Sequence, residues 1–315
     1  MNTRPSPDSQ GRLSVAMAWR MTRPGSLLLT LVACALGTAT AAACGCGFDP
    51  GLALGATVLA LWAHAAANVL NDWQDALSGA DAANTDAVHP FTGGSRLIQE
   101  DRVSIRQTAD LARGMLLVLV PGGLWLVAQT GGGVLWLGLA GVVLIWAYSA
   151  PPLKLMSRGL GELAVGLAWA LVVVGMDYVQ RRQFFPIPAS VALNFGLLVA
   201  ALLLANSVPD ARADAEVSKR TLAVRLGPRG AAWAYLWLIL LAHGWLVLSV
   251  WLLVPPVQAL WGLVSLPLSL LAATGLLRHA GRPAKLRPAL LLTSLAPLVH
   301  AAGMTWGFVQ LARAF

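Results

Sequence analysis

The chain has 315 residues, of which 57% are hydrophobic and 11% charged, and its formal net charge is +8. Soluble domains contain roughly 25% charged residues, so this composition excludes a soluble protein and indicates an integral membrane protein. The basic residues lie in the connections at the edges of apolar segments, where they set membrane orientation, so the positive charge is not a sign of nucleic-acid binding.

Residues 1–24 are expected to form an N-terminal tail, in which residues 13–21 have the pattern of a short helix lying on the membrane surface. Residues 25–315 form the transmembrane domain, because they contain repeated apolar windows of about 20 residues, the length that crosses a bilayer. The predicted fold is therefore all-α and polytopic, with nine transmembrane helices. Their windows are 25–43, 51–70, 112–130, 132–150, 160–179, 187–206, 231–253, 257–277 and 288–311.

Lys and Arg are divided unequally between the two sides of these spans. Nineteen of the 22 lie in the N-terminal region or in and beside the connections 71–111, 151–159, 207–230 and 278–287, all on one side. Arg181, Arg182 and Arg313 lie on the other side. Because cytoplasmic loops carry the excess of Lys and Arg, we expect the first side to face the cytoplasm from a plasma (inner) membrane.

An acidic motif stands where the second apolar window ends. Residues 68–81 read Asn-Val-Leu-Asn-Asp-Trp-Gln-Asp-Ala-Leu-Ser-Gly-Ala-Asp. Residues three and four apart share one face of a helix. Asn68, Asn71, Asp72 and Asp75 are therefore expected to point the same way.

A related motif stands where the sixth window ends, and residues 206–214 read Asn-Ser-Val-Pro-Asp-Ala-Arg-Ala-Asp. The same spacing rule places Asn206, Asp210 and Asp214 on one helix face. Four spans separate the ends of the second and sixth windows, so both motifs fall on the predicted cytoplasmic side. We expect the two acidic faces to form one site.

Carboxylates crowded together raise one another's pKa unless a cation neutralises them. Mg²⁺ prefers hard oxygen ligands and usually binds one or two carboxylates together with waters and substrate phosphates. The paired motifs therefore predict a metal–diphosphate site with Mg²⁺ as the cofactor. The expected metal ligands, which are also expected to be catalytic, are Asp72, Asp75, Asp210 and Asp214.

Basic residues on the same side complete this prediction, because cations stabilise the charge that builds on a departing diphosphate. Arg96 follows Gly93 and Gly94, which allow backbone to approach a ligand closely. Lys154 follows the end of the fourth window and is also expected to be catalytic. The full set of residues expected to bind the diphosphate is Asn68, Asn71, Arg96, Lys154, Asn206, Lys219 and Arg220.

The connection 71–111 is long, and long loops in compact proteins usually have a function. We expect it to form a structured cap over a cavity. His64 lies two helical turns from Asn71 and is a candidate for the lining of that cavity.

These motifs resemble those of the UbiA superfamily of intramembrane prenyltransferases. Residues 71–75 with Gly79 and Asp81 are similar to the first aspartate-rich motif of that family, and residues 210–214 followed by Lys-Arg-Thr-Leu-Ala-Val-Arg-Leu-Gly are similar to the second. The resemblance extends over nearly the whole chain. Further stretches that carry it are Arg23-Pro24, residues 148–154 and residues 159–162.

Within the superfamily, residues 78–81 and 159–162 look most like the 1,4-dihydroxy-2-naphthoate polyprenyltransferase (MenA) branch. Two positions depart from the family pattern: Pro209 directly precedes Asp210, and Ser218 stands where Gly often precedes Lys-Arg-Thr. The departures leave the superfamily resemblance intact and weaken the choice of branch.

The resemblance implies helices around a central cavity open toward the cytoplasmic face, Mg²⁺ dependence, a polyprenyl diphosphate donor and an aromatic acceptor within the bilayer. In the MenA branch the acceptor is 1,4-dihydroxy-2-naphthoate, for menaquinone biosynthesis. No obligate protein partner is evident. Other acceptors stay open, of the 4-hydroxybenzoate, homogentisate or chlorophyllide type. A secondary transporter is the alternative from another class, but transporters place their sites near the membrane midplane, whereas these acids stand at span ends.

Overall fold

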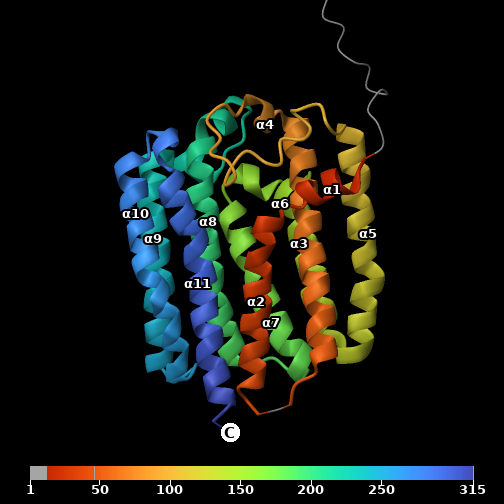
Figure 1. Ribbon diagram of the computed structural model, residues 1–315, viewed down its shortest axis with the longest axis vertical. Helices are drawn as coiled ribbons and strands as arrows, with labels where there is room; N and C mark the ends of the chain where they lie inside the picture. The colour runs from red at the N-terminus through yellow and green to blue at the C-terminus, as the bar shows by residue number, and fades with distance from the viewer. Residues whose placement is uncertain (1–12, 46, 315) are drawn as a thin grey trace, which may run out of the picture.

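The structure is a computed structural model that describes residues 13–45 and 47–314, so residues 1–12 of the predicted tail lie outside the described part. The described residues form helices joined by turns and loops, and no strand occurs among them. The long helices run roughly parallel to one axis in a single bundle (Figure 1). The predicted all-α class is confirmed.

Nine helical segments of the described chain are long and apolar enough to cross a membrane, which confirms the number that hydropathy predicted. The eighth is composite, because a 3₁₀ segment continues directly into an α-helix. The nine are α2 (Pro24–Ala42), α3 (Pro50–Ser78), α5 (Ile105–Thr130), α6 (Gly132–Ser149), α7 (Gly161–Arg181), α8 (Pro186–Glu216), α9 (Leu222–Trp251), η2 with α10 (Val257–Ser265 and Leu266–His279) and α11 (Arg287–Ala312).

Two spans continue well beyond their apolar windows. α3 has 29 residues and α8 has 31, so both acidic motifs are helical and extend the ends of their spans. α3 stops at Gly79, whose φ of 79° is in the left-handed region that glycine adopts without strain. The motifs lie at the same end of the bundle, at the top of Figure 1, opposite the C-terminus.

α9 begins earlier than its predicted window and is interrupted at Gly227, which has a φ of 69° and is followed by Pro228. Proline lacks the N–H that would continue the helical ladder, so the interruption divides a short first segment, residues 222–226, from the long apolar span. The predicted window at residues 231–253 corresponds to the part of α9 that follows this break.

The short helix predicted in the tail is present as α1 (Val15–Met21), with Ser14 as its N-cap. Met21 is fully buried and packs with Val69 and Leu70 of α3, while Trp19 is exposed. α1 is thereby fixed to the end of α3 where the first acidic motif lies. Its position on a membrane surface stays a prediction.

The connection after α3 forms a structured cap. It contains the short helix α4 (Ala80–Ala83) and an irregular loop that crosses the tops of α3 and α8 (Figure 1). Leu97 and Val103 of this loop are buried against α3. Asp86 forms an ion pair with Arg212 of α8 at 3.1 Å. The loop therefore joins the two helices that carry the acidic motifs.

Candidate active site

The two acidic motifs meet through a single lysine side chain. The Nζ atom of Lys219 lies 3.0 Å from Oδ1 of Asp75 and 3.3 Å from Oδ1 of Asp214. All three side chains are largely buried, with exposed side-chain fractions of 13%, 9% and 7%. Burial alone would lower the pKa of Lys219, but the attraction of Asp75 and Asp214 outweighs this effect and raises it. Residues from both motifs therefore lie together in one buried cluster.

Arg23 is a second buried cation, and it lies beside the first motif. Its guanidinium forms an ion pair with Asp72, and its Nη2 atom donates to Oδ1 of Asn71 at 3.2 Å. Burial by itself would lower the pKa of Arg23, but the carboxylates of Asp72, Asp81 and Asp75 together outweigh this effect and raise it. The sequence analysis did not assign Arg23 to the site, because 49 residues separate it from its partner.

The glycine-rich loop passes close to these acids. A Cβ atom on Gly94 would lie 2.7 Å from Oδ2 of Asp81 and 3.1 Å from Oδ1 of Asp72, so a side chain has no room there. The backbone N–H of Ser95 donates to Oδ2 of Asp72 at 3.3 Å. Asp81 is buried in this cradle, and the sequence analysis noted it within the motif without assigning it to the site.

Asp210 is held by the cap rather than by a cation. Nδ2 of Asn84 donates to Oδ1 of Asp210 at 2.7 Å. Oδ1 of Asn84 and Oδ1 of Asn206 are buried without a hydrogen-bond partner among the described residues. Two oxygen acceptors beside a carboxylate are thus available to a ligand, since buried polar atoms seldom stay unsatisfied.

The asparagines of the first motif have separate roles in the structure. Nδ2 of Asn71 donates to Oδ2 of Asp75 at 3.0 Å, within the acidic cluster. Nδ2 of Asn68 donates to the carbonyl of Thr22 at 2.9 Å and to Oγ of Ser26 at 3.1 Å, one turn deeper in the bundle. Asn68 therefore connects α3 to the beginning of α2.

The remaining predicted basic residues lie around the acidic cluster. Nη1 of Arg96 donates to the carbonyl of Asn84 at 3.4 Å, which places it at the edge of the cap. Lys154, in the left-handed region with a φ of 44°, has no carboxylate within ion-pair distance in the described chain. Arg220 is exposed, and its backbone N–H donates to the carbonyl of Ser157 in η1 (Leu155–Arg158) at 3.1 Å.

The departure at Ser218 has a structural explanation. Ser218 has a φ of 60°, a conformation that glycine adopts more easily, and this turn directs Lys219 back toward Asp214. The backbone N–H of Lys219 also donates to the carbonyl of Asp214 at 2.8 Å. Pro209 is accommodated inside α8, which continues through it to Glu216.

The donor set of the cluster fits Mg²⁺, because every candidate ligand is a carboxylate or amide oxygen. No group of three or more acidic, His or Cys residues in the described chain is arranged to hold a metal by itself. A magnesium ion that shares one or two carboxylates with a bound diphosphate does not need such a group. The carboxylates are meanwhile neutralised by Arg23 and Lys219.

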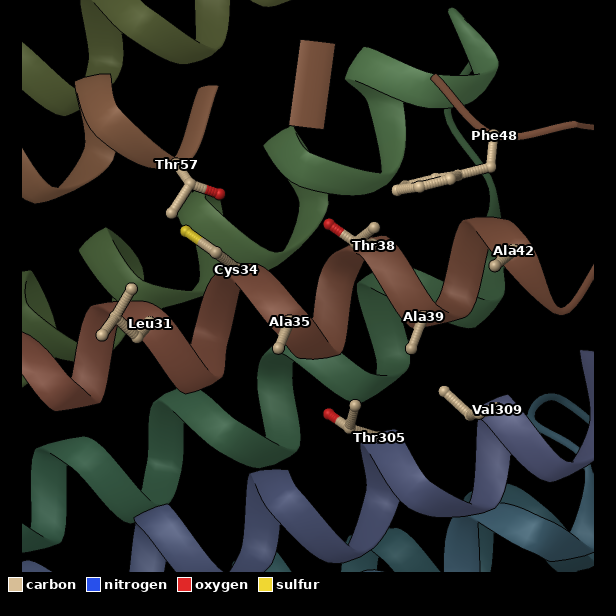
Figure 2. A pocket seen from close by; sticks show the side chains of 10 residues that line it. All are labelled: Leu31, Cys34, Ala35, Thr38, Ala39, Ala42, Phe48, Thr57, Thr305 and Val309. Carbon is tan, nitrogen blue, oxygen red and sulfur yellow. The ribbon is translucent and has the colours of Figure 1, made fainter. Parts of the chain in front are cut away.

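An apolar cavity of about 420 Å³ lies away from the acids, toward the opposite end of the bundle. Figure 2 shows that it is lined from α2, α3, α11 and the loop that carries Phe48. Small side chains of α2 such as Ala35 and Ala39 form one wall, and Thr57 of α3 and Val309 of α11 face it from other helices.

The fold is that of an intramembrane prenyltransferase of the UbiA type. A UbiA homolog from Archaeoglobus fulgidus bound to DMAPP and Mg²⁺ superposes with a TM-score of 0.57 at 15% identity, over 91% of this chain and 98% of that one. A homolog from Aeropyrum pernix K1 gives a TM-score of 0.55 at 16% identity, over 93% and 98%.

The sequence places the chain in that family. The UbiA prenyltransferase family matches residues 26–295. The 1,4-dihydroxy-2-naphthoate octaprenyltransferase of Escherichia coli (strain K12) is 30% identical over 90% of this chain and 92% of its own length. The protein of the same description from Mycobacterium tuberculosis is 34% identical over 74% and 77%, and that from Bacillus subtilis 28% over 86% and 89%. The chain belongs to the UbiA prenyltransferase family and is a prenyltransferase.

A pH-dependent stability follows from the crowding of Asp81. Burial raises the pKa of Asp81 to about 7, and the neighbouring carboxylates of Asp75 and Asp72 contribute to this shift. An unfolded chain has an Asp pKa of about 3.9, so the folded state holds an extra proton between these values and loses stability as pH rises through them. Asp81→Asn removes this loss. In metal-free detergent solution its thermal midpoint should exceed that of wild type near pH 8, and the excess should be much smaller near pH 5, where wild type has lost only part of this stability.

Asp110→Asn is the matched control, because Asp110 is exposed and paired only with Arg113 on the same helix. It should leave the pH dependence of the midpoint unchanged. An equal difference between Asp81→Asn and wild type at both pH values would contradict the assignment.

Proposed function

We propose that this protein transfers a polyprenyl group from an isoprenyl diphosphate to an aromatic acceptor, 1,4-dihydroxy-2-naphthoate, in menaquinone biosynthesis. The observation that carries the proposal is the buried cluster in which Lys219 joins Asp75 and Asp214, with Arg23 beside Asp72. Relatives named for this transfer, and UbiA homologs bound to DMAPP or GPP with Mg²⁺, support it. Family membership favours it over secondary transport.

The carboxylates of both motifs would hold Mg²⁺ against the donor diphosphate. Bound Mg²⁺ supplies neutralisation of the charge that develops on the departing diphosphate. Asn71 and Asn206 contribute amide oxygens beside these carboxylates, and Asn68 supports the first motif from one turn below. The proposed metal ligands are Asp72, Asp75, Asp210 and Asp214.

The basic residues would bind the oxygens of the diphosphate. Lys219 already lies inside the cluster, and Arg96 lies at the edge of the cap beside Asn84. Lys154 and Arg220 lie on adjoining turns at the same end of the bundle, connected through η1. Fixed cations at such a position stabilise the charge that forms as the bond to carbon breaks. Arg23 belongs to the same set of cations.

The reaction proceeds in two steps: the donor loses its diphosphate, and the acceptor then attacks the prenyl cation. The bond between C1 of the prenyl chain and the diphosphate oxygen breaks, and its electron pair leaves with the diphosphate. A ring carbon of the acceptor then uses an electron pair of the ring to form a new bond to C1 of the allylic cation. The ring regains its aromaticity when the substituent on that carbon leaves without its bonding electrons, as a proton or as CO2. The cap and the burial of Asp72 and Asp75 keep water away from that cation.

The position of the apolar cavity between α2, α3 and α11 is an argument for a donor with a long prenyl chain. Thr57, which lines this cavity, and Asp72 are fifteen residues apart on α3, which corresponds to about 22 Å along the helix. A prenyl chain held by its diphosphate at Asp72 fills the cavity only if it extends that far. A polyprenyl donor meets this requirement, and a single isoprenyl unit does not.

The first test neutralises one carboxylate in each motif. Asp72→Asn and Asp210→Asn preserve the side-chain shape and remove one charge. Each should therefore lower turnover by roughly 10²-fold or more, the scale for loss of one group that stabilises developing charge. Turnover is measured with farnesyl diphosphate and 1,4-dihydroxy-2-naphthoate in membranes.

The control is Asp49→Asn, at the other end of the bundle. Asp49 caps α3 by accepting from the N–H of Leu52 at 2.9 Å, and asparagine caps a helix equally well, so activity should be preserved. Near-normal activity of both site variants, or a rate that survives exhaustive chelation of divalent metal, would refute the metal–diphosphate site.

The acceptor is tested by complementation. The protein should restore menaquinone in a host that lacks its own naphthoate prenyltransferase, because residues 78–81 and 159–162 resemble that branch and several relatives carry its name. The lipid product is identified by mass spectrometry. Rescue of a ubiquinone-deficient host alone would replace this acceptor with 4-hydroxybenzoate.

We place the site on the cytoplasmic side of the plasma (inner) membrane, with residues 25–315 as the catalytic domain and residues 1–24 as its tail. By their place in the sequence, nineteen of the 22 Lys and Arg residues fall on the side of the predicted spans that carries the acids. In a cysteine-free background, single cysteines at positions 85 and 218 should be labelled only from the cytoplasm and one at position 183 only from outside. Opposite labelling of 85 and 218 would exclude a shared site.

A further inference from the structure

α2 and α3 are connected by polar contacts that continue below the acidic cluster. The contacts recur every three or four residues on α2 and every four residues on α3, so each lies about one helical turn, roughly 6 Å, below the last. They therefore lead from the diphosphate end into the membrane-spanning part of the bundle. In order of depth, the contacts are Arg23 with Asp72, Ser26 with Asn68, and Thr30 with His64.

The deepest of these contacts leaves one side of a histidine ring open. Oγ1 of Thr30 lies 2.8 Å from Nδ1 of His64, and Thr30 is fully buried. This contact fixes the orientation of the imidazole ring. Nε2 of His64 has no hydrogen-bond partner among the described residues.

A second unpartnered polar atom lies next to that ring. Trp169 of α7 packs against His64 at a centroid distance of 4.9 Å and an interplanar angle of 84°. Its indole N–H is buried and has no hydrogen-bond partner in the described chain. A buried donor without a partner is uncommon in native proteins and needs an explanation.

The position of this pair suits a substrate that reacts beside the diphosphate. His64 and Asp72 are eight residues apart on α3, which is about 12 Å along the helix. C1 of a prenyl chain whose diphosphate lies at Asp72 would be between these two levels. The acceptor ring has to lie next to C1, which puts it at the level of α3 between Asp72 and His64.

We infer that His64 and Trp169 form the binding subsite for the hydroxylated aromatic acceptor, an inference that rests on the function proposed above. In the tautomer that carries its proton on Nδ1, His64 donates to Thr30 and Nε2 accepts a hydrogen bond from a phenolic hydroxyl of the acceptor. The indole N–H of Trp169 donates to another oxygen of the same molecule. Aromatic walls with a few placed polar groups are the usual form of such sites.

The chemistry of the subsite distinguishes it from the diphosphate site. An imidazole and one indole N–H supply no fixed charge, whereas the acids and Arg23 lie two turns above. When a phenolic hydroxyl donates a hydrogen bond to a neutral nitrogen, the aromatic ring that carries the hydroxyl becomes richer in electrons. This favours attack by the ring on a cation. The subsite therefore controls affinity and orientation of the acceptor and not binding of the donor.

The test separates the two substrates. His64→Phe preserves an aromatic ring without nitrogen, and Trp169→Phe removes the indole N–H. Each should raise the KM for 1,4-dihydroxy-2-naphthoate, by about tenfold for His64→Phe, the scale of one hydrogen bond between neutral groups. The KM for farnesyl diphosphate should stay at the wild-type value. His64→Gln restores a hydrogen-bonding group and should lie between wild type and His64→Phe.

Trp237→Phe is the matched control, because Trp237 is 68% exposed on α9 and should change neither KM. Calorimetric binding of 1,4-dihydroxy-2-naphthoate to donor-free protein in detergent gives an independent measurement, and His64→Phe should weaken it by the same factor. Thermal midpoints show whether each variant folds. If His64→Phe does not fold, the milder substitution Trp169→Phe still tests the subsite.

The outcomes distinguish the subsite from the reaction. Turnover with an unchanged acceptor KM in Trp169→Phe and the folded His64 variants would overturn the subsite and leave the proposed function standing. Equal increases in both KM values would also overturn it, because they indicate general disturbance of the site. Binding of the acceptor that depends on His64, in a wild-type protein that transfers no prenyl group to it, would support the subsite and overturn the proposed function. Neither binding nor turnover would overturn both.

Discussion

The rest of the site depends on neutralisation of crowded carboxylates within the bundle. Asp72, Asp75, Asp81 and Asp214 are buried where α3, α8 and the cap meet. Buried carboxylates without a partner would be protonated or would destabilise the fold. Lys219 and Arg23 supply the opposing charge from segments outside both acidic motifs.

This requirement explains several features of the surrounding chain. Ser218 takes a conformation that suits glycine because the turn has to return Lys219 to Asp214. Gly94 has no side chain because the loop passes within contact distance of Asp81 and Asp72. Asn84 satisfies Asp210 and so fixes the cap to α8. Under the proposed function, Mg²⁺ would neutralise the same carboxylate oxygens that Lys219 and Arg23 neutralise in this structure.

The side chains along α3 change from charged to neutral polar to apolar with depth in the bundle. Charged groups lie at its C-terminal end, a histidine and an indole lie two turns deeper, and an apolar cavity reached from Thr57 lies near its other end. Under the proposed function these levels correspond to the diphosphate, the aromatic ring and the prenyl chain. One helix thereby sets the order in which the parts of both substrates are arranged across the membrane.

Local sequence patterns define the nine spans, the end of the bundle at which the acids lie, and the helical faces of both motifs. Length and hydropathy define a membrane span, and helical spacing defines a face, so these properties are local. Helix packing, in contrast, is what brings Lys219 into the cluster and leaves the adjacent Arg220 exposed. It also brought Arg23 to Asp72 and Thr30 to His64, across 49 and 34 residues. Such contacts arise from the packing of α2 against α3, which leaves no periodic signal in the sequence.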